Sequence, residues 1–164
     1  MTSAVSVRRF ALAGALALSS ALSFSLPAKA ENLLASDPSS ILAVMQSEGY
    51  IATLGRDDQG DPMIESRLSD SEFKVYFYGC DAGRDCLSVQ LSAGYDLDAP
   101  TTAGLVNEWN RDNRYSRAFI DDEGDPFLRI DVKMQKDGNG VQNFIETLDI
   151  WRRLVEDFER YINW

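Results

Sequence analysis

The stretch Phe73–Tyr95, FKVYFYGCDAGRDCLSVQLSAGY, decides the fold. Setting Cys80 opposite Cys86 aligns the flanking residues as an antiparallel hairpin with one apolar and one polar face, as a half-buried pair of strands requires. A shift by one residue would mix the two faces, so the pattern also predicts the register. The expected cross-strand pairs are Phe77–Val89, Val75–Leu91 and Phe73–Ala93 on the apolar face, and Tyr78–Ser88, Tyr76–Gln90 and Lys74–Ser92 on the polar face.

Residues 1–30 predict a secretory signal peptide. Arg8 and Arg9 precede an apolar segment, and Ala28-Lys29-Ala30 supplies small residues for cleavage after Ala30. The apolar segment is short and ends at this cleavage pattern, which argues against a membrane span; an uncleaved anchor is the alternative. The two arginines also suggest twin-arginine export. However, Phe10 follows them one position too early for that motif, which favours the general secretory route. We therefore expect a periplasmic or secreted protein.

The remainder of the chain, from position 31 to position 164, is long enough for a single domain with its own core. The predicted leader contains three basic residues and no acid, so this domain has 13 basic and 26 acidic residues and a net charge of −13. Such a charge repels nucleic acid and anionic lipid surfaces, and favours a basic partner if the partner is charged. We expect no nucleic-acid partner and no second membrane segment.

The two cysteines of the chain, Cys80 and Cys86, are expected to form a disulfide bond, because an exported protein meets oxidising conditions. A redox-active pair is the alternative, but five residues separate the cysteines where thiol oxidoreductases have two. A zinc site is a weaker alternative, since two thiols without any histidine supply only half of the usual ligands.

The pattern along the domain predicts an α+β fold, an antiparallel sheet with packed helices in the order α-β-β-β-β-α-β-β-α. Residues 31–36 are expected to be a loose terminus. Asp37 is expected to cap the first helix, which Gly49 ends, and Thr101 or Thr102 to cap the second, which ends near Asn113. The last helix is predicted to start at Asn139-Gly140, and its wide apolar stripe to be core or a dimer face. Short strands are predicted at 50–54, 63–68, 116–120 and 127–132.

One turn motif, Asp-Asp-x-Gly-Asp-Pro, occurs twice, at residues 57–62 and again at 121–126. Each copy follows a predicted helix and strand and precedes another strand. Two interpretations stay open: an internal duplication of a helix–hairpin unit, or convergence on residues that make good turns.

The absence of histidine from all 164 residues excludes Ser-His-Asp and Cys-His catalysis and histidine-based metal sites. No phosphate-binding loop, dinucleotide motif or nucleophile elbow is present. We expect no enzyme activity, cofactor or metal. The alternative is a carboxylate-based hydrolase or a calcium-binding protein that uses Asp57, Asp61, Asp121 and Asp125 in the acidic turns.

The segment Leu105-Val106-Asn107-Glu108-Trp109-Asn110 is unusual for a helix, because asparagine is a modest helix former and two asparagines flank a tryptophan. One interpretation is that Asn107, Trp109 and Asn110 form a surface for a partner protein. The other is that the asparagines face solvent or bond to neighbouring loops.

Several segments in this order resemble the YbjN-type domain, also called the bacterial sensory transduction regulator family. The resemblance runs from about Ser39 to Ile162 and implies a fold similar to type III secretion chaperones, with a non-enzymatic role in regulation or protein interaction. It supplies no catalytic residues. The predicted export signal and disulfide differ from the cytoplasmic members of that family. The segments are Phe77-Tyr78-Gly79-Cys80, Cys86-Leu87-Ser88-Val89-Gln90, Val106-Asn107-Glu108-Trp109-Asn110, Arg117-Ala118 and Asp131.

Overall fold

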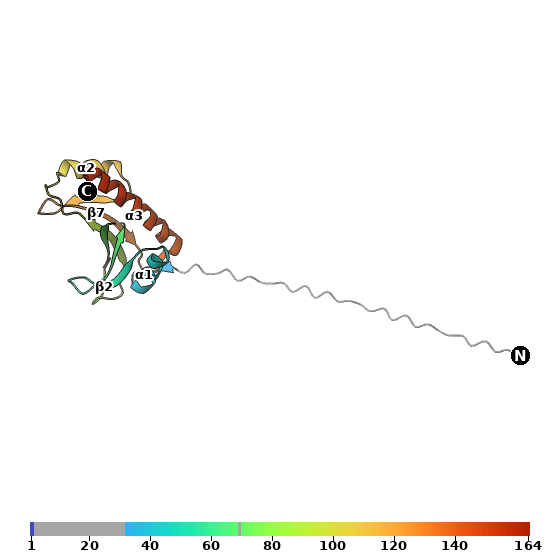
Figure 1. The fold of residues 1–164 in the computed structure, drawn as a ribbon. Helices are drawn as coiled ribbons and strands as arrows, with labels where there is room; N and C mark the ends of the chain where they lie inside the picture. Colours follow the sequence, from blue (N-terminus) through green and yellow to red (C-terminus); the bar gives the residue numbers. More distant parts are fainter. Residues whose placement is uncertain (2–31, 69) are drawn as a thin grey trace.

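The computed structural model describes residue 1, residues 32–68 and residues 70–164 (Figure 1). The predicted signal peptide and its cleavage position lie outside the described residues. Within these described residues, three helices and eight strands follow one another in a mixed order. The helices are α1 (Pro38–Ser47), α2 (Ala103–Asp112) and α3 (Val141–Ile162). The strands are β1 (Asn32–Leu33), β2 (Ala52–Arg56), β3 (Pro62–Leu68), β4 (Ser71–Tyr78), β5 (Ser88–Gly94), β6 (Arg117–Ile120), β7 (Pro126–Lys133) and β8 (Asn139–Gly140).

Six of the strands form one antiparallel sheet in the order β2-β3-β4-β5-β7-β6 (Figure 1). All three helices contribute buried side chains to the core that covers one face of this sheet. The predicted α+β class, an antiparallel sheet with packed helices, is therefore confirmed. Among the described residues, no helix combines the length and apolar character that a bilayer span requires.

The central hairpin has the predicted register. The pairing of β4 with β5 runs from Lys74–Ser92 to Tyr78–Ser88, which confirms five of the six expected pairs. Phe73 and Ala93 lie just beyond the paired section, and both are buried. The polar face is less solvated than its composition suggests. Gln90 and Ser92 are each only 6% exposed, because neighbouring long side chains cover them, and Gln90 Nε2 donates to Asp131 Oδ1 at 2.6 Å.

The helix caps follow the sequence signals. The side chain of Asp37 accepts a hydrogen bond from the N–H of Ser40 at 3.4 Å, and Thr102 Oγ1 accepts one from Leu105 at 3.3 Å. The stripe of α3 packs into the core, in which Trp151 has no exposed surface. The other buried members of that stripe are Phe144, Leu148, Leu154, Val155, Phe158 and Ile162.

The start of the domain differs from its predicted loose terminus. β1 pairs with β8, so that Asn32 lies opposite Gly140 and Leu33 opposite Asn139. Leu33 is 3% exposed and Ala35 is fully buried. The expectation for residues 32–36 was wrong because two small or apolar side chains in this segment find room in the core. Residues 139 and 140 form β8, and α3 begins at Val141 and not at Asn139-Gly140 as predicted.

The two Asp-Asp-x-Gly-Asp-Pro turns have the same internal structure. In the turn between β2 and β3, Asp57 Oδ1 accepts hydrogen bonds from the N–H groups of Gln59 at 3.0 Å and Asp61 at 2.9 Å. In the turn between β6 and β7, Asp121 Oδ1 accepts the two equivalent bonds at the same distances. The hairpins that carry these turns flank β4 and β5 on opposite sides. Each motif thus closes a hairpin that follows a helix, in the orders α1-β2-β3 and α2-β6-β7.

Candidate functional site

Trp109, one of the three residues predicted to face a partner, lies in the core. It is 4% exposed, its Nε1 donates to Ser116 Oγ at 3.0 Å, and its ring meets that of Phe158 edge-on with centroids 4.9 Å apart. This tryptophan joins α2 to α3. In this structure its side chain is not available to a partner.

The two asparagines beside Trp109 have different environments. Asn110 Oδ1 accepts a hydrogen bond from the N–H of Ala118 at 2.7 Å, and Asn110 Nδ2 donates to the carbonyl of the same residue at 2.9 Å. Asn110 therefore covers the outer edge of β6. Asn107 is exposed, and its side chain forms no hydrogen bond among the described residues. Of the predicted surface, only Asn107 is both exposed and free of such contacts.

The four aspartates considered for carboxylate chemistry are not brought together. The turn of Asp57 and Asp61 lies at the end of the sheet where β4 leads into the disulfide loop, because β3 is antiparallel to β4. The turn of Asp121 and Asp125 lies at the opposite end, beside Gly94. Among the described residues, no group of three or more acidic or cysteine side chains is arranged to hold a metal ion.

The predicted disulfide is confirmed, since Cys80 and Cys86 are bonded with Cα atoms 3.8 Å apart. Cys86 is 2% exposed and belongs to the core, so the bond attaches the loop between β4 and β5 to the body of the domain. The same loop packs against the turn between β2 and β3. Gly83 has a φ of +74°, and a Cβ there would lie 2.8 Å from the carbonyl oxygen of Gly60. The close approach requires glycine.

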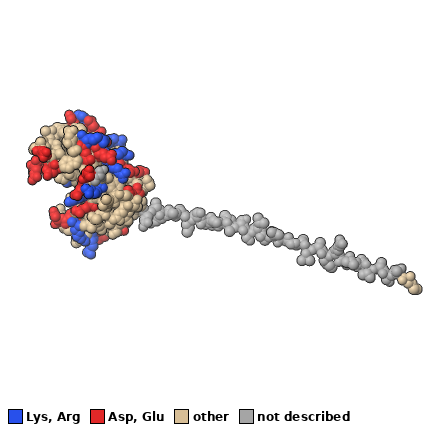
Figure 2. Space-filling model, viewed as in Figure 1, with Lys and Arg blue, Asp and Glu red and all other residues tan. Residues whose placement is uncertain are grey.

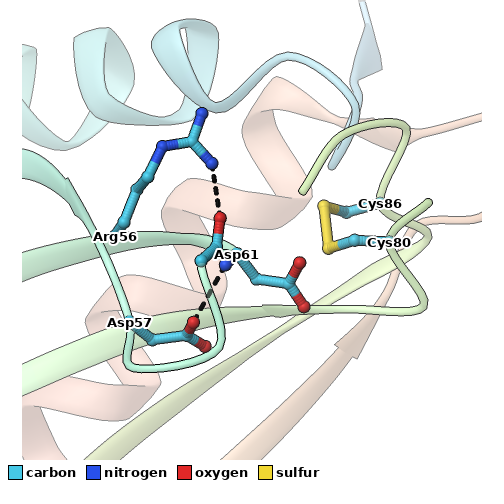
Figure 3. The surroundings of a disulfide bond; sticks show 6 residues. Arg56, Asp57, Asp61, Cys80 and Cys86 are labelled. Atoms are coloured by element: carbon cyan, nitrogen blue, oxygen red, sulfur yellow. Dashed lines mark hydrogen bonds between the residues drawn. A yellow bond between two sulfur atoms is a disulfide. The ribbon is translucent and has the colours of Figure 1, made fainter. Parts of the chain in front are cut away.

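Arg56 lies beside both this turn and the disulfide loop. It extends from the end of β2, and its Nη1 donates to the carbonyl of Gly60 (Figure 3). A Cβ at Gly83 would also lie 3.0 Å from Arg56 Nη1. The first acidic turn, the end of β2 and the disulfide loop are therefore in direct contact, and together they form one wall of a surface cleft.

This cleft, of about 500 Å³, is the best candidate for a binding site. Its lining comes from the end of β2, the first turn of α1 and the disulfide loop. Two arginines, Arg56 and Arg84, line it with one acidic residue, Asp85. Leu54 is 43% exposed and contributes apolar surface. The sequence did not single out these residues, because they are distant along the chain and match no motif.

The surroundings of the cleft contrast with the rest of the surface. The ten residues of α1 include no charged side chain, and Figure 2 shows a continuous uncharged area in the region of this helix. Acidic and basic side chains lie around this area, and a second uncharged area is visible in the upper left part of the domain. Charged residues are depleted at the centre of protein interfaces relative to the remaining surface. The α1 side of the cleft thus has the composition of an interface.

Burial raises the pKa of two tyrosines outside the cleft, Tyr50 and Tyr95. Burial and the nearby Glu159 carboxylate raise the pKa of Tyr95 well above its ordinary value of 10.0. Burial also raises the pKa of Tyr50, whose hydroxyl donates to the carbonyl of Leu148 at 3.1 Å. A proton held this firmly favours a structural over a proton-transferring role.

The fold defines a small α+β domain with a six-stranded antiparallel sheet covered on one face by helices. Residues 37–164 match the family model YbjN, described as "Putative bacterial sensory transduction regulator". The chain belongs to the YbjN family, which confirms the predicted resemblance. No curated protein and no solved structure matches the chain.

Proposed function

We propose that the protein is an exported regulatory module that acts by binding another protein and catalyses no reaction. Family membership supports the regulatory part. The observation that carries the binding part is the cleft beside the disulfide loop, where two arginines and an exposed leucine line a concave surface next to an uncharged helix. Such a combination of an apolar surface and a few polar groups is typical of binding sites.

The placement of the carboxylates supports binding over hydrolysis. Asp57 accepts two backbone hydrogen bonds within its own turn, and so does Asp121. These groups stabilise turns at opposite ends of the sheet. No specific observation favours the carboxylate-based hydrolase or the calcium-binding alternative, so neither is proposed.

Export is part of the proposal and rests on the sequence of residues 1–30 together with the disulfide. Structural disulfides persist in oxidising compartments such as the periplasm. Intact mass of the purified native protein tests this directly. Processing after Ala30 leaves a chain that starts at Glu31 and ends at Trp164. A full-length chain recovered from the cytosol would contradict it.

Quantitative affinity capture tests the binding function. The processed chain, with its disulfide intact, is immobilised and exposed to an envelope extract at low and high salt. A control column carries the same chain after irreversible heat denaturation. We expect one protein to be retained by the folded chain alone, and its purified form to bind with a saturable, salt-sensitive affinity. Retention of no protein at either salt concentration would refute the proposed function.

A homodimer was the other expectation, because the apolar stripe of α3 was interpreted as either core or a dimer face. The described structure uses most of that stripe in its own core. We therefore propose a monomeric binding module, and light scattering at increasing protein concentration tests this. A constant mass of two chains would contradict it.

A further inference from the structure

The two outer edges of the sheet differ in how their backbone groups are satisfied. On the β6 edge, Asn110 bonds both the N–H and the carbonyl of Ala118. A strand edge left open exposes a row of donors and acceptors to which another strand can pair. Asn110 thus blocks strand pairing at the centre of β6.

On the β2 edge, backbone groups also point outward, but no described side chain bonds them as Asn110 bonds those of Ala118. The N–H of Asp57 donates to the carbonyl of Asp61 at 2.9 Å. Hydrogen-bonded and non-hydrogen-bonded residue pairs alternate along an antiparallel pair of strands. Counting back from Asp57, the backbone groups of Gly55 and Thr53 therefore bond to β3. The N–H and carbonyl of Leu54, which lies between them, point away from β3. Neither backbone group of Leu54 has a partner among the described residues.

A comparison of the two turn motifs shows why Leu54 is uncovered. Aligning Asp57 of the first motif with Asp121 of the second makes Leu54 equivalent to Ala118, and Gln46 equivalent to Asn110. Gln46 does reach the edge, but its Nε2 donates to the carbonyl of Ala52 at 3.0 Å, two residues before Leu54. The helix of the first unit therefore covers the start of β2 and leaves its second half open.

This open half of β2 is the strand wall of the cleft. Leu54, Gly55 and Arg56 all belong to its lining, together with Pro38 of α1 and Arg84 of the disulfide loop. The volume of about 500 Å³ is that of an ordinary ligand pocket. An extended segment that follows the outer edge of β2 beside this cleft would pair with the free groups of Leu54.

The charge of the cleft indicates what such a segment carries. Arg56 and Arg84 form no ion pair among the described residues, although acidic residues outnumber basic ones by 26 to 16 in the chain. Asp85 is the one acidic residue in the lining. A guanidinium binds a carboxylate through paired N–H donors, and this is the interaction that the two arginines leave unused.

We propose that this cleft binds an extended segment of a partner protein by strand addition to β2, with an Asp or Glu side chain of that segment held between Arg56 and Arg84. Main-chain hydrogen bonds to Leu54 supply affinity, and the arginines supply specificity. The inference deepens the proposed function, on which it rests, by naming the site and the chemistry of the partner segment.

The test uses the processed chain and a library of random nonapeptides displayed between flexible linkers, so that no peptide presents a free carboxyl terminus. We expect enriched peptides to contain an acidic residue within an alternating, β-branched sequence. The synthetic peptides should shift the amide resonances of Leu54, Gly55 and Arg56. Failure to enrich any peptide, or resonance shifts confined to another surface, would overturn the proposal.

Two variants identify the contacts. Arg84→Glu should weaken peptide affinity by about tenfold, as loss and reversal of a charge-assisted contact does, whereas Arg153→Glu on the exposed side of α3 should not. Leu54→Pro removes the outward N–H without breaking the bonds of β2 to β3, and should abolish binding. Thermal unfolding of each variant shows that it is folded. Unchanged affinity in folded Arg84→Glu would overturn the assigned site.

The same variants separate this inference from the proposed function. If a captured envelope protein still binds the Arg84→Glu and Leu54→Pro variants, the protein is a binding module and the β2 site is refuted. If the library yields β2-directed acidic peptides but no envelope protein is retained, the site stands and the proposed function is refuted.

Discussion

The carboxamide of Asn110 bonds both backbone groups of Ala118, at 2.7 Å and 2.9 Å, and replaces the neighbouring strand that β6 lacks. Asn110→Ala removes two hydrogen bonds at a site open to water, so we expect the free energy of unfolding to fall by about 1–2 kcal/mol. Asn110→Asp keeps the acceptor but places a carboxylate oxygen against the carbonyl of Ala118, so it should cost at least as much as the alanine. Urea unfolding of the wild type and the two variants measures these free energies.

The control for this prediction is Asn107→Ala, on the same helix. The side chain of Asn107 is exposed and forms no hydrogen bond among the described residues. Its removal should therefore change the free energy of unfolding by no more than about 0.5 kcal/mol. Equal losses at both positions would contradict the assigned role of Asn110. Loss of partner capture with Asn107→Ala alone would assign this residue to a second binding surface.

Replacement of Trp151 tests the packing of α3 against the sheet. The side chain is fully buried and lies 5.8 Å from Phe73 between ring centroids. We expect Trp151→Ala to lower the free energy of unfolding by about 3–5 kcal/mol. Trp151→Phe should cost much less, because Nε1 has no hydrogen-bond partner in the described structure and its removal leaves no group unsatisfied. Chemical denaturation checks both, and a near-zero effect of the alanine would show that the residue is not in the core.

The matched turns allow a paired test of their aspartates. An asparagine at position 57 or 121 retains the Oδ1 acceptor, so Asp57→Asn and Asp121→Asn should change stability little. Alanine removes an acceptor of two backbone bonds, and we expect a loss of about 1 kcal/mol in each turn. Thermal unfolding with and without millimolar calcium measures the effect. A calcium-dependent stabilisation of the wild type, lost in the asparagine variants, would instead establish a metal site.

The bond between Cys80 and Cys86 should protect both thiols from alkylation in the native protein until a reductant is added. The double variant Cys80→Ser, Cys86→Ser should lose about 2 kcal/mol, since the bond closes a short loop. That loop forms a wall of the cleft, so peptide affinity should fall along with stability. Rapid labelling of the native protein without reductant would contradict the structural role.

Tyr95 should make stability fall at alkaline pH. Its folded pKa lies above the ordinary value of 10.0 because of burial and the Glu159 carboxylate. Unfolded chains ionise this phenol above pH 10 whereas the folded chain does not, so the stabilisation is complete below pH 10 and is lost as pH rises toward the folded pKa. The slope for one such group is about 1.4 kcal/mol per pH unit. Urea unfolding at a series of pH values should show a shallower decline for Tyr95→Phe, and parallel curves would disprove the assignment.

The sequence was most informative where one pattern determined the structure alone. The hairpin register followed from two cysteines and an alternation of apolar and polar residues. The stripe of α3 was visible at helical spacing. The burial of Leu33 and Ala35 was not predictable, because it depends on space that β8 and α3 leave between them.

The site was less predictable than the fold. Asn110 was recognised as unusual, but its role required knowing that its helix runs beside the edge of β6. The cleft joins α1, β2 and the disulfide loop, which only the sheet order brings together. No local signal distinguishes Arg56 or Arg84 from any other exposed arginine. The repeated turn motif was a usable signal, since it indicated which residues of the two units to compare.

The equivalence of Gln46 and Asn110 has an evolutionary meaning. If one ancestral unit was copied, both copies began with the same seal on their outer strand, and one difference in side-chain length and direction later separated them. On that history the second copy kept the seal over Ala118, and in the first copy the seal no longer covers Leu54. Selection on the uncovered edge would then leave the covered edge of the other half unchanged.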